Sequence, residues 1–177
     1  MAGHNKWSKI KRQKAGTDAA KAKIFGKLSR AITIAAKLGS GLDQAIAKAR
    51  EFNMPNDNID RAVKKATEAG SSQLESITYE AYGPGGCALI IEALTANRNK
   101  AAQEIKFILS EHGTQLASQG SASWAFAQEK DPSTGLGVNW KPTMGVPLSP
   151  EDEQKLGALI DALEENDEVQ EVFTNAD

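Results

Sequence analysis

The residues best suited to binding a polyanion are concentrated near the start of the chain. Lysine and arginine surround a single tryptophan in the segment Gly3–Lys14, with polar side chains between them. Lys and Arg neutralise phosphate groups, and the ring of Trp7 can stack on an unpaired base. This combination suits RNA with unpaired bases better than uniform duplex DNA. The candidate contacts here are His4, Asn5, Lys6, Trp7, Lys9, Lys11, Arg12 and Lys14.

Trp7 has a second interpretation, which is structural. Trp7 and Ile10 could fold back as a hydrophobic anchor, because a tryptophan buries a large apolar area. Both roles can hold for one residue. Trp7→Ala separates them, since loss of stacking weakens binding at an unchanged melting temperature, whereas loss of an anchor lowers that temperature.

Charge divides the chain into two parts. Residues 1–66 carry 15 Lys and Arg against five Asp and Glu, a net charge of +10, while the remainder carries −12 and the whole chain −2. A basic segment of this kind is typical of a polyanion binder, although a merely solvated lysine-rich surface is the alternative. Lys23, Lys27 and Arg30 recur at helical spacing and are further candidate contacts.

The basic part is predicted to be a three-helix bundle. Apolar residues recur at three- and four-residue steps in Thr17–Leu38, Leu42–Phe52 and a third helix through about Glu68. Glycine after Leu38 and proline at Pro55 separate the helices, with Asn56 or Asp57 as the expected cap of the third. We therefore expect a nucleic-acid-binding domain over residues 1–70.

Residues 71–177 are predicted to form a two-layer α+β domain. Alternating apolar residues indicate strands, and three-to-four-residue spacing indicates helices. Two helices would cover one face of a four-stranded sheet. The stretch 129–148, rich in Gly and Pro, is predicted to be a linker. The expected strands are 77–82, 87–94, 122–126 and 168–174, and the expected helices are 97–112 and one beginning at Ser149.

Catalytic and metal chemistry find little support in the sequence. The chain has two histidines and one cysteine, without the spacing of a metal site or a nucleophile–base pair. We therefore predict no enzyme activity, cofactor, metal or small-molecule substrate. The Gly83–Gly86 segment lacks the Lys-Ser/Thr of a phosphate-binding loop and is better explained as a turn between strands. Arg98 and Lys100, at the start of a helix, are weaker candidate phosphate contacts.

The same composition bears on location. The longest apolar run is Cys87–Ile91, far short of the roughly 18 residues that a membrane span needs. No apolar segment of a secretory signal follows the basic N-terminus. With a single cysteine, a disulfide framework is excluded, and a reducing cytoplasm is expected.

The sequence resembles the YebC family along nearly its whole length. The resemblance is carried by the first seven residues, by 53–55 and 82–86, by Asn97-Arg98-Asn99, by 120–126 and by the closing 169–175. The family includes probable transcriptional regulators and a mitochondrial translational activator of cytochrome c oxidase. It implies a three-helix domain and an α+β domain with a third domain inserted, for which 129–148 leaves no room here.

The resemblance implies two functions, and a third remains open. One is a ribosome-associated translation factor that binds ribosomal RNA and relieves stalling at proline-rich sequences. The other is a DNA-binding transcriptional regulator. The basic tail and helix face, without an evident helix-turn-helix pattern, favour the first, although phosphate contacts are common to both. A protein-interaction adaptor using the acidic C-terminal helix is the remote alternative. The sequence does not fix the oligomeric state.

Overall fold

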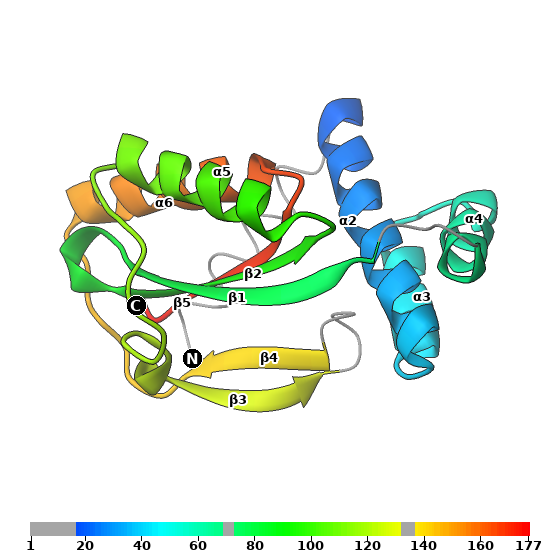
Figure 1. The fold of residues 1–177 in the computed structure, drawn as a ribbon. Coiled ribbons are helices and arrows are strands. Elements are labelled where there is room, and N and C mark those ends of the chain that lie inside the picture. Colours follow the sequence, from blue (N-terminus) through cyan, green and yellow to red (C-terminus); the bar gives the residue numbers. More distant parts are fainter. Residues whose placement is uncertain (1–16, 69–72, 132–136) are drawn as a thin grey trace. The chain divides into compact units, whose positions relative to one another are not determined.

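The computed structural model of the chain describes residues 17–68, 73–131 and 137–177 (Figure 1). Its described residues fall into two compact units. One is built around three helices and includes residues 128–131 and 137–139, and the other, residues 75–127 and 140–177, is built around a β-sheet. None of the helices in these described ranges has the length and apolarity needed to span a membrane.

Three helices make up the first unit: α2 (Asp18–Leu38), α3 (Leu42–Glu51) and α4 (Asn56–Thr67). Local signals set the ends of α2, as the sequence predicts. The Thr17 hydroxyl accepts a hydrogen bond from the backbone N–H of Ala20 at 3.2 Å, and Gly39 ends the helix with a φ of 67°. One expectation is corrected, because the N-cap of α4 is Pro55, with a φ of −59° and no side-chain cap.

Apolar side chains of all three helices form one core. The Thr33 hydroxyl on α2 also donates to the carbonyl of Ala62 on α4 at 3.0 Å, so a buried polar group is satisfied between these two helices. The predicted three-helix bundle is therefore present in the structure. Its buried residues are Leu28, Ile32, Ala35, Ala45, Ala49, Met54, Ile59 and Ala62.

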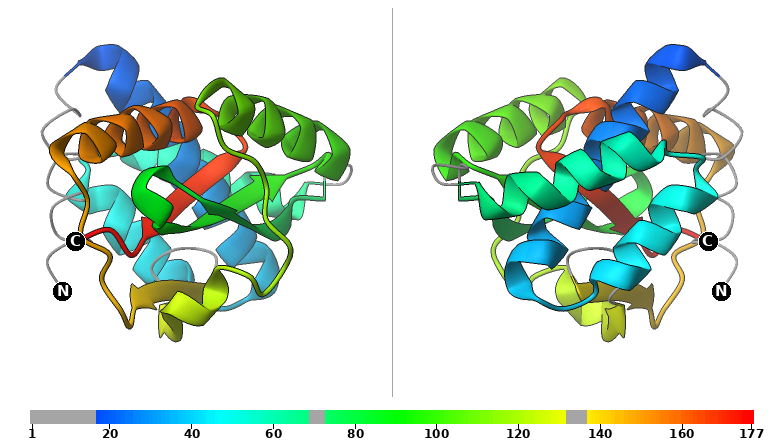
Figure 2. Two further views of the ribbon diagram at one scale, coloured as in Figure 1. Left: turned by 90° about the vertical axis from the view of Figure 1, so that its left-hand side faces the viewer. Right: turned by 90° about the vertical axis from the view of Figure 1, so that its right-hand side faces the viewer.

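The second unit contains a three-stranded antiparallel sheet in the order β1-β2-β5. Its strands are β1 (Glu75–Tyr82), β2 (Ala88–Thr95) and β5 (Val169–Thr174). Every residue of the central strand β2 is buried, as its apolar run predicts. Helices α5 (Arg98–Glu111) and α6 (Pro150–Glu165) lie over the same face of this sheet (Figures 1 and 2). The predicted α+β class is thereby confirmed.

The opposite face of the sheet is covered by a 3₁₀ turn, η2 (Ser123–Ala125), and by the base of a two-stranded sheet. The two strands are β3 (Phe126–Asp131) and β4 (Gly137–Pro142). Phe126 and Trp140 meet edge to face, with ring centroids 6.5 Å apart. They form a small core with β2 and β5, whose buried members are Ala88, Ile90, Ala122, Ala125, Phe126 and Phe173.

Three details of the prediction differ from this arrangement. The expected four-stranded sheet is a sheet of three strands and a separate one of two. The expected strand 122–126 is mostly the turn η2, because backbone N–H groups of this segment bind a buried carboxylate and not a neighbouring strand. The expected linker 129–148 contains half of β3 and all of β4, and Trp140 anchors it on the sheet.

Trp140 is anchored by a buried carboxylate on β2. Its indole N–H donates to Glu92 Oε1 at 2.7 Å, and the Thr78 hydroxyl donates to the same oxygen at 2.9 Å. Glu92 is 1% exposed. Burial raises the pKa of Glu92; the two donors oppose that rise and the charge of Glu171 adds to it.

Candidate nucleic-acid interface

Most of the predicted contacts precede the described part of the chain. His4, Asn5, Lys6, Trp7, Lys9, Lys11, Arg12 and Lys14 all lie in residues 1–16, outside the described residues.

Helix α2 carries the described part of the predicted basic surface. At 3.6 residues per turn, Lys23, Lys27 and Arg30 fall within a sector of about 60°. The core residues of the same helix lie on a different side, as separate hydrophobic and charged faces require. Lys23 is exposed, and Lys27 and Arg30 are half-buried. One helix thus has both a core face and a cationic face.

Helix α4 adds a basic group that the site prediction did not include. Arg61, Lys64 and Lys65 are exposed and, at spacings of three and four residues, share one face of α4. The i, i+3, i+4 spacing was the signal available in the sequence. Lys64 and Lys65 also lie in the last turn, where cations stabilise the negative end of the helix dipole, so part of their role is structural.

The two candidate contacts of the α+β unit are held by acidic side chains. Arg98 Nη2 lies 2.8 Å from Glu75 Oε2 on β1. Lys100 Nζ lies 3.4 Å from Glu168 and 3.7 Å from Glu104. Both cations are largely exposed, and exposed ion pairs are weak, so a phosphate could replace either carboxylate and the predicted contacts of Arg98 and Lys100 stay predictions.

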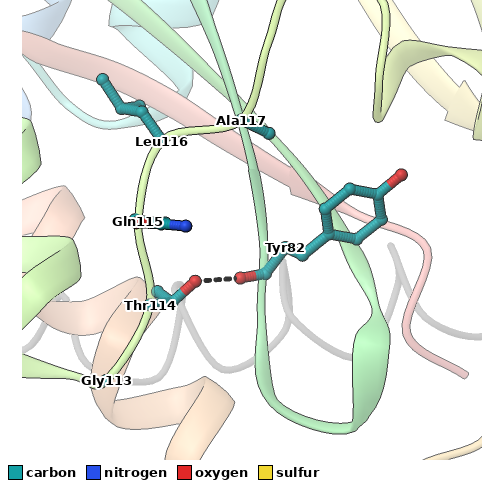
Figure 3. Close-up of a pocket in the computed structure, with 6 residues that line it drawn as sticks. All are labelled: Tyr82, Gly113, Thr114, Gln115, Leu116 and Ala117. Atoms are coloured by element: carbon teal, nitrogen blue, oxygen red, sulfur yellow. Dashed lines mark hydrogen bonds between the residues drawn. The ribbon is translucent and has the colours of Figure 1, made fainter.

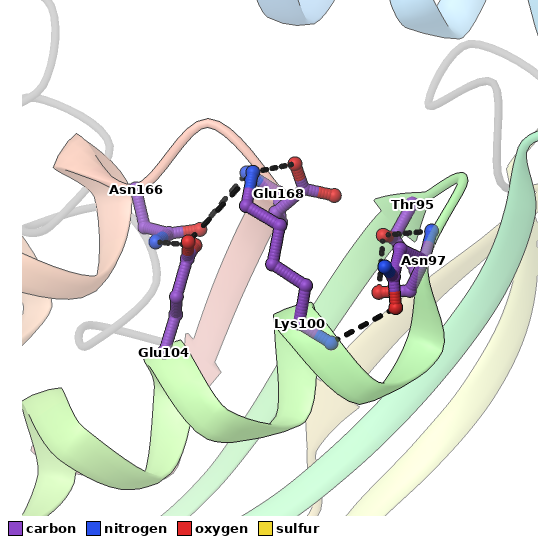
Figure 4. A network of polar contacts seen from close by, with 6 residues as sticks. All are labelled: Thr95, Asn97, Lys100, Glu104, Asn166 and Glu168. Carbon is purple, nitrogen blue, oxygen red and sulfur yellow. Dashed lines mark hydrogen bonds and ion pairs between the residues drawn. The ribbon is translucent and has the colours of Figure 1, made fainter.

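Figure 4 shows how Lys100 belongs to a network at the start of α5. The Asn97 side chain caps this helix by accepting the backbone N–H of Lys100 at 3.1 Å. The side chain of Asn166 donates to Glu104 at 2.7 Å and accepts the backbone N–H of Glu168 at 2.9 Å. The network joins α5 to the turn between α6 and β5, which explains the sequence motif around Asn97.

The glycine segment is a turn, as predicted. It forms the short 3₁₀ element η1 (Pro84–Gly86) between the antiparallel strands β1 and β2. The backbone N–H of Gly83 donates to the Cys87 carbonyl at 2.8 Å, so it is used within the protein. Gly85 has a φ of 70°, and a Cβ there would lie 2.5 Å from Leu148. Close packing of the turn explains this glycine without a phosphate ligand.

A buried carboxylate holds the loop of residues 120–123, which precedes Trp124, in a contact that the sequence did not predict. Glu80 on β1 is 6% exposed and accepts three backbone N–H groups, from Gly120 at 2.7 Å, Ala122 at 2.7 Å and Ser123 at 2.8 Å. Burial alone would raise the pKa of Glu80, but these donors outweigh it and lower the pKa below its ordinary value. The charged carboxylate therefore fixes residues 120–123 beside β1.

Next to this loop lies a pocket at the end of β1. Its lining residues are Tyr82 and the segment 113–117 (Figure 3). The Thr114 hydroxyl donates to the Tyr82 carbonyl, and the backbone N–H of Ala117 donates to the Glu80 carbonyl at 2.8 Å. Two segments distant in sequence are thus joined along the edge of the sheet.

The titratable side chains of the described residues were compared with the requirements of a metal site. Within residues 17–68, 73–131 and 137–177, no group of three or more His, Cys, Asp or Glu side chains is arranged to hold a metal ion. Cys87 is buried, and burial raises the pKa of its thiol.

These features define a class of protein in which one chain contains a helical unit with a cationic face and an acidic α+β unit. Comparison with known sequences identifies that class. The sequence model of the TACO1/YebC protein N-terminal domain matches residues 5–69, and that of the TACO1/YebC second and third domain matches 74–132 and 128–176. The chain belongs to the TACO1/YebC family.

Individual relatives extend this finding over the full chain. A protein of Rubrobacter xylanophilus named "Probable transcriptional regulatory protein" is 39% identical over 239 aligned positions, covering 100% of this chain and 96% of the relative. A protein of Fervidobacterium nodosum with the same name is 39% identical over 237 positions, covering 100% and 94%. Because this chain has 177 residues, both alignments include residues of the relatives without a counterpart here.

The fold has a counterpart among solved structures. The crystal structure of a conserved hypothetical protein from Aquifex aeolicus matches with a TM-score of 0.79 and 29% identity. The match covers 92% of this chain and 93% of that one.

Proposed function

We propose that the protein is a cytoplasmic, nucleic-acid-binding regulator of gene expression, and that a domain of residues 1–70 binds the nucleic acid. The ligand is ribosomal RNA, and the protein acts in translation at proline-rich sequences. The names of the relatives support the general class, a regulator of gene expression. The finer assignment to the ribosome rests on the resemblance to the YebC family and on the charge pattern.

The observation that carries the proposal is the separation of charge. Residues 1–66 have a net charge of +10, and described cations lie on the faces of α2 and α4. The remaining residues are strongly acidic and would repel a polyanion. Nucleic acid should therefore contact the helical unit through phosphates, with the segment 3–14 supplying further cations and an aromatic ring.

A second candidate function, regulation of transcription by binding DNA, is favoured by the names of the relatives. Both functions use the same phosphate contacts, so charge does not separate them. The full chain should therefore be sedimented with ribosomes through sucrose gradients at low and high salt, beside a DNA-binding assay with competitor. Co-sedimentation at low salt without competitor-resistant DNA binding supports translation, and the reverse result supports transcription.

The location of the surface is tested by the salt dependence of RNA binding. The logarithm of the affinity should fall with the logarithm of the salt concentration, by a slope of about 0.7 per contact with single-stranded RNA. Neutralising Lys23, Lys27 and Arg30 to Gln should make that slope shallower by up to about 2. Lys106→Gln, an exposed cation of α5, is the matched control and should leave it unchanged. Equal slopes for the triple variant and wild type would place the surface elsewhere.

A further inference from the structure

Trp124 is exposed but firmly held. The residue is 59% exposed, and its indole N–H donates to the Tyr82 hydroxyl at 3.2 Å. That hydroxyl in turn donates to the Ser121 carbonyl. The polar groups of both rings are satisfied within the protein, which leaves ring surface facing solvent.

The support beneath these rings is rigid. Tyr82 is the last residue of β1. Trp124 follows the loop whose N–H groups bind the Glu80 carboxylate. The two aromatic residues are therefore fixed by backbone contacts before any ligand arrives, and binding would require little ordering of side chains.

The adjoining pocket has the size of a ligand site and a neutral lining. Its volume is about 410 Å³, within the range of roughly 300–1,000 Å³ for small-ligand pockets. Figure 3 shows the side chain of Gln115 directed from the 113–117 segment toward β1, so an amide lies near the Tyr82 strand. In the same view the ring of Tyr82 points away from this segment, so the pocket offers the Gln115 amide to the edge of a base, and stacking falls to the exposed ring of Trp124.

The charge of this region differs from that of its surroundings. Residues 112–128 contain no Asp, Glu, Lys or Arg, whereas residues 75–177 hold 17 acids against six Lys and Arg. The carboxylate nearest to this stretch, Glu80, is buried and accepts three backbone N–H groups, so an anionic strand would be repelled less here than over most of the α+β unit. The region can accept one base of a strand whose phosphates are neutralised elsewhere.

We propose that the exposed ring of Trp124, beside the Tyr82 pocket, stacks on an unpaired nucleobase of RNA. This inference rests on the proposed function and adds a single-strand preference to it. A proline-rich peptide fits less well, because recognition of its carbonyls needs N–H or O–H donors. The Trp124 N–H and the Tyr82 O–H are already donated to protein acceptors. Stacking needs neither donor.

The test observes Trp124 directly in the full chain. The protein is labelled with fluorotryptophan and titrated with uridylate or adenylate trinucleotide at roughly 0.5 M salt, where phosphate contacts are weak. Fluorine NMR should show a shift of the Trp124 resonance, assigned with Trp124→Phe. Trp140, half-buried against the sheet, is the internal control and should not shift.

A second measurement compares RNA ligands at low salt. Trp124→Ala should weaken binding of a single-stranded oligonucleotide about 5- to 150-fold, the loss expected for one stacked base, and leave duplex binding unchanged. Phe107→Ala is the matched control, because Phe107 is 64% exposed on α5 of the same unit. Melting curves of both variants verify that the fold is retained.

The outcomes separate this inference from the proposed function. A Trp124 resonance unmoved by either trinucleotide overturns stacking on Trp124, even if longer RNA binds with the expected salt dependence. A shifted resonance in a protein without salt-dependent RNA binding supports stacking on Trp124 and refutes the role of the helical unit. A shift caused by a proline-rich peptide, and by neither trinucleotide, overturns the inference in favour of a peptide ligand.

Discussion

Glu80→Gln removes the charge that fixes the loop of residues 120–123 while keeping the size of the side chain. In the native protein one carboxylate oxygen accepts the N–H of Gly120, and the other accepts those of Ala122 and Ser123. Glutamine has a single acceptor oxygen, and its NH₂ group would face an N–H donor. At least one backbone N–H therefore loses its acceptor.

The magnitude follows from the number of bonds lost. A hydrogen bond to a charged group contributes about 1.5–3 kcal/mol, and a buried donor without an acceptor costs about 1–3 kcal/mol. With one or two bonds affected, the free energy of unfolding should fall by about 2–5 kcal/mol. Because the pKa of Glu80 is lowered by folding, its contribution is present above the ordinary value of 4.5 and lost as the pH falls through the folded value. The difference between variant and wild type should therefore shrink in acid.

Urea unfolding followed by circular dichroism at neutral and acid pH measures this difference. Glu75→Gln is the matched control, since Glu75 lies on the same strand and bonds Arg98, but its side chain is 45% exposed. An exposed ion pair contributes at most about 1 kcal/mol. Equal losses for the two variants, or a Glu80→Gln effect that does not change with pH, would refute the assigned role of the carboxylate.

Three further substitutions test individual contacts. Glu92→Gln should become more stable relative to wild type as the pH rises above about 4.5. Burial raises the pKa of Glu92 in the folded protein, so the wild type loses unfolding free energy as the pH rises and the variant does not. Unfolding free energies at pH values of about 5 and 8 measure this difference, and a difference that stays constant would contradict it. Gly85→Ala should lower the melting temperature more than Gly86→Ala. Both glycines have a positive φ, which costs any other residue about 1–2 kcal/mol, but only at Gly85 would the new Cβ meet the side chain of Leu148. Equal melting temperatures would argue against this packing. Asn97→Ala should cost about 0.5–2 kcal/mol through loss of the α5 cap, whereas Asn99→Ala, without that bond, is the control in the same unfolding assay.

Local signals in the sequence predicted much of the secondary structure. Thr17, Gly39 and Ser149 act within one turn of the helix ends that they mark, so a short window of sequence contains the whole interaction. The basic face of α2 follows from spacing alone in the same way. What local pattern could not supply were the contacts of Glu80 and Glu92, each with partners some 40 or more residues away. Those contacts decide that 122–126 is a turn and that 129–148 contains strands.

The Tyr82 pocket was missed for the same reason. Tyr82 and Trp124 come from separate segments, and only the folded sheet edge brings them together. Each is an ordinary aromatic residue in its own window of sequence. The ion pairs of Arg98 and Lys100 also depend on the tertiary fold, and the sequence alone did not show that both cations pair with carboxylates.

The order β1-β2-β5 has a consequence for how the protein forms during synthesis. β2 can pair with β1 as soon as their hairpin leaves the ribosome, but its other edge stays open until α5, the β3–β4 sheet and α6 have all been made. Through that interval a largely apolar strand has unpaired backbone groups, which is the condition under which nascent chains aggregate. Closure of this edge also needs Asn175, whose side chain accepts the backbone N–H of Ala88 at 2.7 Å. A polypeptide released before Val169 would therefore contain a folded helical unit beside a sheet that is open to aggregation.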